Sequence, residues 1–180
     1  MWTVSAVGRL LAVVCVAAGL GACATGASSS RAADHLEILN HVSCYPFGLD
    51  QIGRGDVAGG TETWKQCFAE GYEFSIFLGF GERTVQRGID ARVAFARRIY
   101  ESQGYVRTSH HLANQRVTFT HANQASVRSN ITAWHMKQDG SIVTGVGQWD
   151  VTVMHTAAGW RITQENLTIT GAGALQPLRR

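Results

Sequence analysis

The chain has 180 residues, with 16 lysines and arginines against 13 aspartates and glutamates and a formal net charge of +3. This excess is small, and no basic run is interleaved with aromatic residues, which argues against nucleic acid as a partner. With 45% hydrophobic residues, the composition is that of a globular chain, long enough to form a core without metal ions or disulfides.

The first 22 residues are typical of an export signal, because a single charge, Arg9, precedes an unbroken run of apolar and small residues. The run is too short and too rich in small residues to be a good membrane span. It ends in "LGAC", which resembles the lipobox of bacterial lipoproteins. This resemblance implies cleavage before Cys23, lipidation of its thiol and a lipid anchor in the cell membrane or outer membrane, facing the periplasm or the exterior. Ordinary signal cleavage nearby and an uncleaved N-terminal anchor are the alternatives.

The rest of the chain reads as one domain with two short flanking segments. Residues 23–33 are small and polar and predict a flexible tether, residues 34–175 form the domain, and residues 176–180 are a tail. Cys44 and Cys67 lie inside the domain. They either pair as a disulfide in an oxidising compartment or remain buried thiols on adjacent helices, because sequence alone does not give the distance between their Cα atoms.

Three helices are predicted in the first part of the domain. The first begins at Asp34, which can cap it, and its apolar residues recur every three positions. Asp56 can cap a second helix. The third covers residues 88–104, with apolar residues on one side, charged residues on the other, and Gly104 at its end.

Alternating apolar and polar residues predict strands elsewhere in the domain. One strand lies between the second and third helices, and four long strands follow the third helix as an antiparallel meander. Gly145 and Gly147 in the middle of one long strand favour a bend or a bulge. We therefore expect an α+β fold, in which a bent sheet and the helices packed on its concave face enclose a pocket. The predicted strands are residues 72–80, 111–121, 124–137, 141–156 and 159–170.

The order of these elements resembles that of the SnoaL-like group of the nuclear transport factor 2-like superfamily. Four stretches also stand at matching places: "GLDQIGRGDV", "WKQCF", "SHHLANQRVTF" and "GWRI". The resemblance extends from about Asp34 to Thr170. It implies a cone in which a curved antiparallel sheet wraps around three N-terminal helices, with a hydrophobic pocket at the open end. It also implies a possible homodimer. The superfamily includes dehydratases, isomerases and non-catalytic members, so the resemblance supports the fold more than the chemistry.

One branch of that superfamily matches at individual residues. Scytalone dehydratase and the bile-acid dehydratases use a histidine, an aspartate and a tyrosine in the pocket. The bile-acid type has a tyrosine, four residues and then an aspartate, which Tyr45 and Asp50 match, and His110 falls where the histidine should be. Scytalone dehydratase has its aspartate where this chain has Gly53. The bile-acid branch also has an arginine close to Ile169, which cannot replace it.

A dehydratase or isomerase needs a base for a carbon-bound proton and an acid for the departing group. His110 is the candidate base, and a hydrogen bond from Asp50 would fix which nitrogen of its ring carries the hydrogen. Tyr45 could donate a hydrogen bond to the carbonyl or to the departing oxygen of the substrate. His111 competes with His110, because adjacent strand residues point to opposite faces. Tyr45 and Asp50 are about 140° apart around a straight helix, so Pro46 and the bend that it favours decide whether both face the pocket.

Further candidates for contact with a ligand are His111, Trp134, Trp149 and Phe119, although large aromatic residues more often fill a core. We expect no metal ion, since the histidines form no recognisable ligand pair, and no cofactor, since no phosphate- or dinucleotide-binding motif occurs.

The leading hypothesis is an exported protein that binds a small hydrophobic molecule, such as a cyclic one, and acts as a dehydratase or isomerase. The alternative is a non-catalytic ligand-binding or dimerisation module of the same fold.

Overall fold

A computed structural model describes residues 30–175, apart from the side chain of Leu175. The chain divides into the units Met1–Leu36 and Glu37–Arg180. The export signal, Cys23 and the tail lie outside the described residues. Residues 30–33 are helical, which corrects their assignment to the tether, and Asp34 lies within helical residues instead of capping them. Two adjacent alanines at 32 and 33 favour this longer helix.

The predicted first helix of the domain is interrupted. Residues 37–42 are helical, Ser43 is a turn, and the helix α2 then runs over Cys44–Gly53. The interruption lies just before Pro46, which has no N–H for the carbonyl group one turn earlier. Tyr45 and Asp50 therefore both belong to a separate short helix.

Two more helices follow, and their ends were predicted well. Asp56 caps α3, Val57–Lys65, because its carboxylate accepts a hydrogen bond of 2.9 Å from the backbone N–H of Gly59. The helix α4, Ile89–Gln103, ends at Gly104, which has the left-handed conformation that glycine adopts without strain. Among the described residues, none of the helices has the length and apolar content that crossing a membrane requires.

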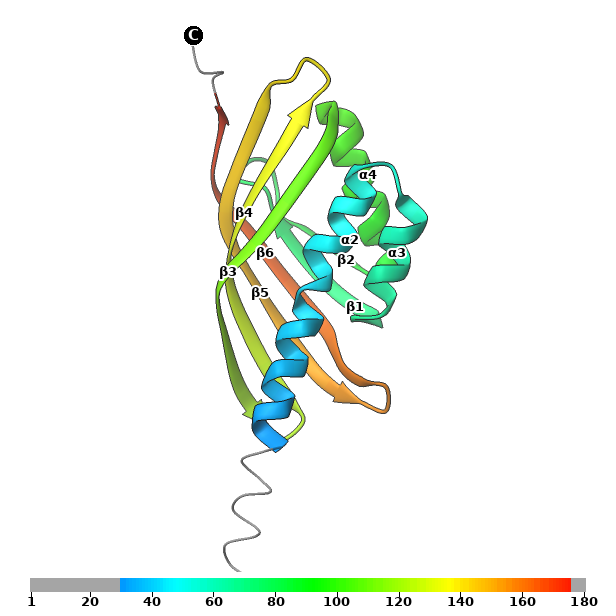
Figure 1. Cartoon of the computed structure of the whole chain (residues 1–180), viewed down its shortest axis with the longest axis vertical. Helices are drawn as coiled ribbons and strands as arrows, with labels where there is room; N and C mark the ends of the chain where they lie inside the picture. Colours follow the sequence, from blue (N-terminus) through cyan, green and yellow to red (C-terminus); the bar gives the residue numbers. More distant parts are fainter. Residues whose placement is uncertain (1–29, 176–180) are drawn as a thin grey trace, which may run out of the picture. The chain divides into compact units, whose positions relative to one another are not determined.

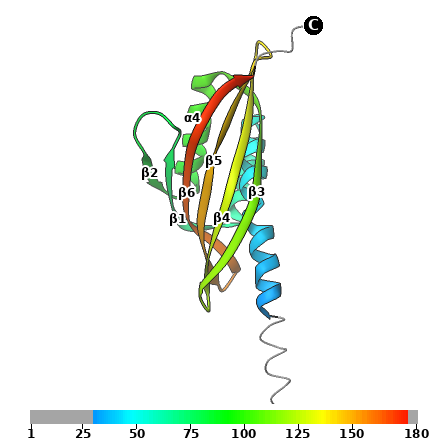
Figure 2. The ribbon, with the colours of Figure 1, turned by 90° about the vertical axis from the view of Figure 1, so that its left-hand side faces the viewer.

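The strands form one curved sheet in the order β2-β1-β6-β5-β4-β3, and α2, α3 and α4 lie on one of its faces (Figure 1). The α+β class is confirmed. The sheet is mixed and not purely antiparallel, because β1 pairs with β6 in parallel. Figure 2 shows β3, β4, β5 and β6 side by side, with the short β2 at the far edge beyond β1. Sequence analysis missed β2. The strands are β1 Phe68–Phe77, β2 Thr84–Arg87, β3 Tyr105–His121, β4 Gln124–Lys137, β5 Ile142–Thr156 and β6 Gly159–Leu175.

The predicted irregularity in β5 is confirmed at Gly147. The pairing of β5 with β6 shifts register between Val146 and Gly147. A Cβ atom added at Gly147 would collide with the carbonyl oxygen of Thr168. Glycine is needed here because the two backbones approach too closely for any side chain.

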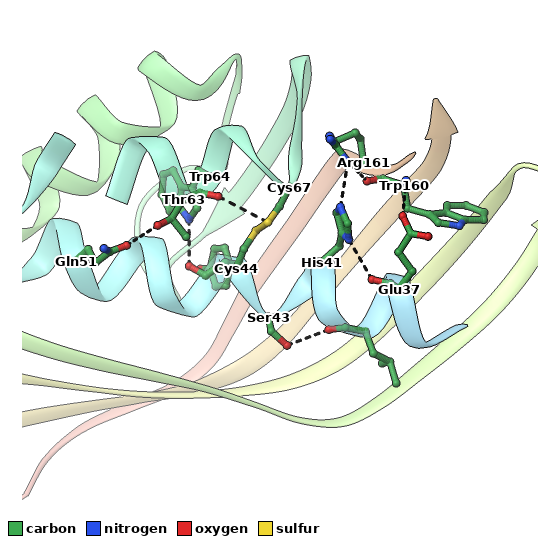
Figure 3. The surroundings of a disulfide bond; sticks show 12 residues. Glu37, His41, Ser43, Cys44, Gln51, Thr63, Trp64, Cys67, Trp160 and Arg161 are labelled. Carbon is green, nitrogen blue, oxygen red and sulfur yellow. Dashed lines mark hydrogen bonds between the residues drawn. A yellow bond between two sulfur atoms is a disulfide. The ribbon is translucent and has the colours of Figure 1, made fainter. Parts of the chain in front are cut away.

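A disulfide between Cys44 and Cys67 links the first residue of α2 to the turn just before β1 (Figure 3). The Cα atoms are 6.4 Å apart, within the usual range for a disulfide. Beside it, the indole N–H of Trp64 donates a hydrogen bond of 3.1 Å to the carbonyl oxygen of Tyr45. These contacts fix the helix turn that carries Tyr45.

Candidate active site

The alternation of side chains along β3 separates the two adjacent histidines. His110 pairs with Ala133 of β4, which is buried, whereas His111 pairs with Thr132, which is exposed. His111 is itself exposed, and its ring contacts the hydroxyl of Ser109 at 3.0 Å. His110 is therefore the histidine that faces the helices.

Asp50, at the C-terminal end of α2, holds His110 through both carboxylate oxygens. Oδ1 accepts a hydrogen bond of 2.6 Å from Nδ1 of His110, and Oδ2 accepts one of 3.2 Å from its backbone N–H. The hydroxyl of Thr108 donates a third, 3.0 Å bond to Oδ1. Because a carboxylate only accepts, Nδ1 carries the hydrogen and Nε2 carries the lone pair of a neutral ring. The sequence-based pairing of Asp50 with His110 is present in the structure.

A second histidine lies against the first. The ring of His135, on β4, meets the ring of His110 edge-on with centroids 5.2 Å apart, and it stacks on Tyr105 at 4.5 Å. Burial, with a smaller contribution from His110, lowers the pKa of His135 to about 4. His135 is thus neutral near pH 7.

Tyr45 joins a different polar cluster. Its hydroxyl accepts a hydrogen bond of 3.3 Å from Nη2 of Arg92, and Arg92 forms a two-point ion pair with Glu165 at 3.2 Å. The indole N–H of Trp149 donates to the same carboxylate. Burial raises the pKa of Tyr45, which keeps its hydroxyl protonated. We call Tyr45, Arg92, Glu165 and Trp149 the buried ion-pair cluster.

A cavity of about 140 Å³ lies between the helices and the sheet. Its wall is mainly apolar, with a small number of polar side chains. His110 does not belong to this wall. Its ring contacts the rings of Tyr45 and His135, and both of these residues belong to the wall. The apolar wall includes Leu49, Ile76, Leu78, Phe95, Leu167 and Ile169, and the polar wall includes Tyr45, Arg92, Tyr100 and His135.

The structure places the four additional candidates for ligand contact outside the wall of this cavity. His111 and Trp134 lie on the outer face of the sheet, because strand alternation points them away from the helices. Trp149 is fully buried in the ion-pair cluster, and Phe119 packs against Trp160. None of the four belongs to the cavity wall.

Sequence analysis missed Arg92, Glu165, Tyr100 and His135, although the first two carry a signal. Arg92 is three residues after Ile89 and four before Ala96, so it lies on the apolar stripe of α4. Glu165 is two residues before Leu167 on the inner face of β6. Each of these charged residues occupies a position where the pattern expects an apolar one. Two such residues of opposite charge indicate a buried ion pair. Among the described residues, no group of three or more histidine, cysteine or acidic side chains could hold a metal ion.

Solved structures share the fold at low sequence identity. A candidate scytalone dehydratase from Novosphingobium aromaticivorans is 22% identical, with 85% of this chain and 98% of that chain covered and a TM-score of 0.64. The hexachlorocyclohexane dehydrochlorinase LinA-type3 from Novosphingobium barchaimii is 13% identical, with 85% and 97% covered and a TM-score of 0.66. An NTF2-like protein with a cystatin-like fold from Novosphingobium aromaticivorans is 20% identical, with 81% and 88% covered and a TM-score of 0.61.

No curated protein matches the chain. The family model of the SnoaL-like domain matches residues 30–165, which is most of the chain. This match agrees with the curved sheet, the helices on one of its faces and the cavity between them. The chain therefore belongs to the SnoaL-like domain family.

Proposed function

We propose that this domain binds a small, mainly apolar molecule in the cavity and removes a carbon-bound proton from it, as a lyase or an isomerase. The observation that carries the proposal is the 2.6 Å hydrogen bond between Asp50 and His110 beside the cavity wall. Similar structures include proteins named as a dehydratase and a dehydrochlorinase, and both names denote eliminations. Eliminations and double-bond isomerisations both start by breaking a C–H bond.

His110 acts as the base. Its Nδ1 is held by Asp50, while Nε2 makes no hydrogen bond to any residue that the structure describes. Nε2 takes the proton, and the negative charge of Asp50 stabilises the imidazolium that forms. The electron pair left on carbon forms a double bond and expels the group on the neighbouring carbon. A departing hydroxide leaves as water with the proton that His110 returns.

Tyr45 assists the departing group. Its hydroxyl oxygen accepts from Arg92, which leaves the hydroxyl hydrogen for a ligand in the cavity. Because burial raises the pKa of Tyr45, the group donates a hydrogen bond and does not transfer its proton. A donor aimed at developing negative charge lowers the barrier in a site shielded from water.

The test follows proton removal from two probes. Deuterium exchange at the α-carbons of cyclohexanone in D₂O reports C–H cleavage, and chloride release from hexachlorocyclohexane reports elimination. We expect His110→Gln to lower either rate about 10²- to 10⁴-fold, the usual contribution of a general base. His111→Gln is the matched control and should leave the rate unchanged, because His111 is on the outer face.

A non-catalytic binding module is the second candidate, and the low exposure of the His110 side chain, 6%, favours it. In that case the wild-type protein would bind probes without exchange or chloride release, and His110→Gln would change neither rate.

We also propose that the protein is exported and anchored through lipidated Cys23, on the strength of the N-terminal sequence alone. The mass of the membrane-extracted protein would show a diacylglyceryl group at Cys23, and Cys23→Ser would release the protein from the membrane. An unmodified wild-type N-terminus would refute the anchor. The homodimer stays a prediction.

A further inference from the structure

The cavity wall contains a hydroxyl group without a partner. Tyr100, near the end of α4, is 8% exposed, and its hydroxyl has no partner in hydrogen-bonding geometry among the described residues. The side chain of Thr108 lies near enough to interact with it, but the Thr108 hydroxyl donates its own hydrogen to Asp50. Burial raises the pKa of this group, so it remains protonated and able to donate. A buried donor without an acceptor is costly, so the cavity favours a ligand that supplies an acceptor.

Tyr100 lies next to the proposed base. Its ring is 5.9 Å from that of His135, which in turn contacts the ring of His110. An oxygen atom bound to Tyr100 would therefore belong to the same small molecule whose proton His110 removes. The hydroxyl of Tyr45 already accepts a hydrogen bond from Arg92. Tyr100 therefore gains more than Tyr45 from a hydrogen bond to a ligand.

The volume of the cavity sets the size of that ligand. An apolar cavity of about 150 Å³ is large enough to hold benzene. The cavity here is about 140 Å³. It therefore suits one six-membered ring.

The charges around the cavity favour a neutral ligand. Arg92 is the one cationic side chain of the wall, and its charge is paired at two points with Glu165. His135 is neutral because its pKa is lowered to about 4, and Asp50 lies just behind the wall with His110. An anion would meet no unpaired positive charge here, and desolvating it would be costly.

We propose that the cavity binds a neutral, single-ring molecule with one hydrogen-bond-accepting oxygen, such as a cyclic ketone, and that Tyr100 donates a hydrogen bond to that oxygen. The inference rests on the ligand-binding part of the proposed function and not on catalysis by His110. It makes Tyr100 a specificity-determining residue that distinguishes a ketone from a hydrocarbon of the same shape.

The experiment compares two probes of nearly equal shape by NMR titration. Cyclohexanone carries the acceptor, and methylenecyclohexane has a CH₂ group in its place. We expect Tyr100→Phe to weaken cyclohexanone binding about 3- to 10-fold, as for the loss of one hydrogen bond, and to leave methylenecyclohexane binding unchanged or tighter. Cyclohexanecarboxylate, the anionic probe, should bind the wild type more weakly than cyclohexanone.

Tyr72→Phe is the matched control. Tyr72 has the other buried tyrosine hydroxyl without a hydrogen-bond partner among the described residues, and it does not belong to the cavity wall. Both variants lose a hydroxyl that makes no internal bond, so neither should lower the melting temperature. Only Tyr100→Phe should change the ratio of the two affinities.

Three results would overturn the inference: no binding of cyclohexanone to the wild type, equal weakening of both probes by Tyr100→Phe, or tighter binding of the carboxylate. Failure of catalysis gives a different pattern. If cyclohexanone binds in a Tyr100-dependent manner but no α-deuterium exchange occurs, the ligand class stands and the proposed role of His110 fails.

Discussion

Two polar clusters lie between the helices and the sheet, and they differ in how completely their groups are paired. In the buried ion-pair cluster, Arg92 and Glu165 bond to each other at two points and to Tyr45 and Trp149. The other cluster contains Asp50, His110, His135 and Tyr100, and we call it the dyad cluster. It leaves Nε2 of His110 and the hydroxyl of Tyr100 without bonds to any described residue.

This difference predicts different responses to mutation in the two clusters. The ion pair of Arg92 and Glu165 is paired on both sides and stabilises one arrangement of the core, so that of this cluster only the hydroxyl hydrogen of Tyr45 is left for a ligand. Open donors and acceptors beside a cavity lower stability until a ligand engages them. The first cluster should therefore respond to mutation mainly in stability, and the second mainly in binding and turnover.

The largest expected effect is on the buried ion-pair cluster. Glu165→Gln keeps the shape of the side chain but leaves the charge of Arg92 unpaired in a site where both side chains are almost fully buried. We expect the free energy of unfolding to fall by about 3 to 5 kcal/mol in urea titrations. The control is Asp150→Asn, whose ion pair with Arg128 is partly exposed, and which should cost less than about 1 kcal/mol. Equal losses in the two variants would contradict the structural role.

A smaller effect is expected from pH, through His135. Its pKa is about 4 in the folded protein and near 6.5 in the unfolded chain. Between these values the unfolded state binds the extra proton, so stability decreases as the pH falls from 6.5 to 4, by up to about 3 kcal/mol. Urea unfolding at pH 7 and 4.5 would measure the decrease. His135→Gln should reduce this decrease, whereas His121→Gln, at the exposed end of β3, should not. An equal decrease in wild type and His135→Gln would exclude His135 as the source.

The smallest stability effect is expected at Asp50, although its effect on function should be large. Asp50→Asn weakens hydrogen bonds at a partly exposed side chain, so we expect a loss of about 1 to 2 kcal/mol in the free energy of unfolding. Proton exchange should nevertheless fall at least about 100-fold, because an amide does not stabilise the imidazolium. A variant with wild-type exchange would show that the pairing with His110 is only structural.

The residues of the two clusters also differ in how far the sequence revealed them. Asp50 and His110 were found because their types and spacing match a known family, and Tyr45 because it precedes Asp50 by five positions. Arg92 and Glu165 are 73 residues apart and were read as ordinary charges, since a single charge in an amphipathic pattern does not name its partner. Tyr100 carried no signal, because a tyrosine on an apolar stripe looks the same whether or not its hydroxyl is paired.

Local chemistry in the sequence determined the α+β class, the cap at Asp56, the end of α4 at Gly104 and the irregular strand at Gly147. These features depend on neighbouring residues and on side-chain periodicity, which can be read along the chain. The tertiary structure decided that β1 lies parallel to β6, that Cys44 bonds to Cys67, and that His110 and not His111 faces inward. It also decided that Trp134, Trp149 and Phe119 do not belong to the cavity wall. Each of these depends on which distant segments meet and on which face of a strand is covered, and no local pattern contains that information.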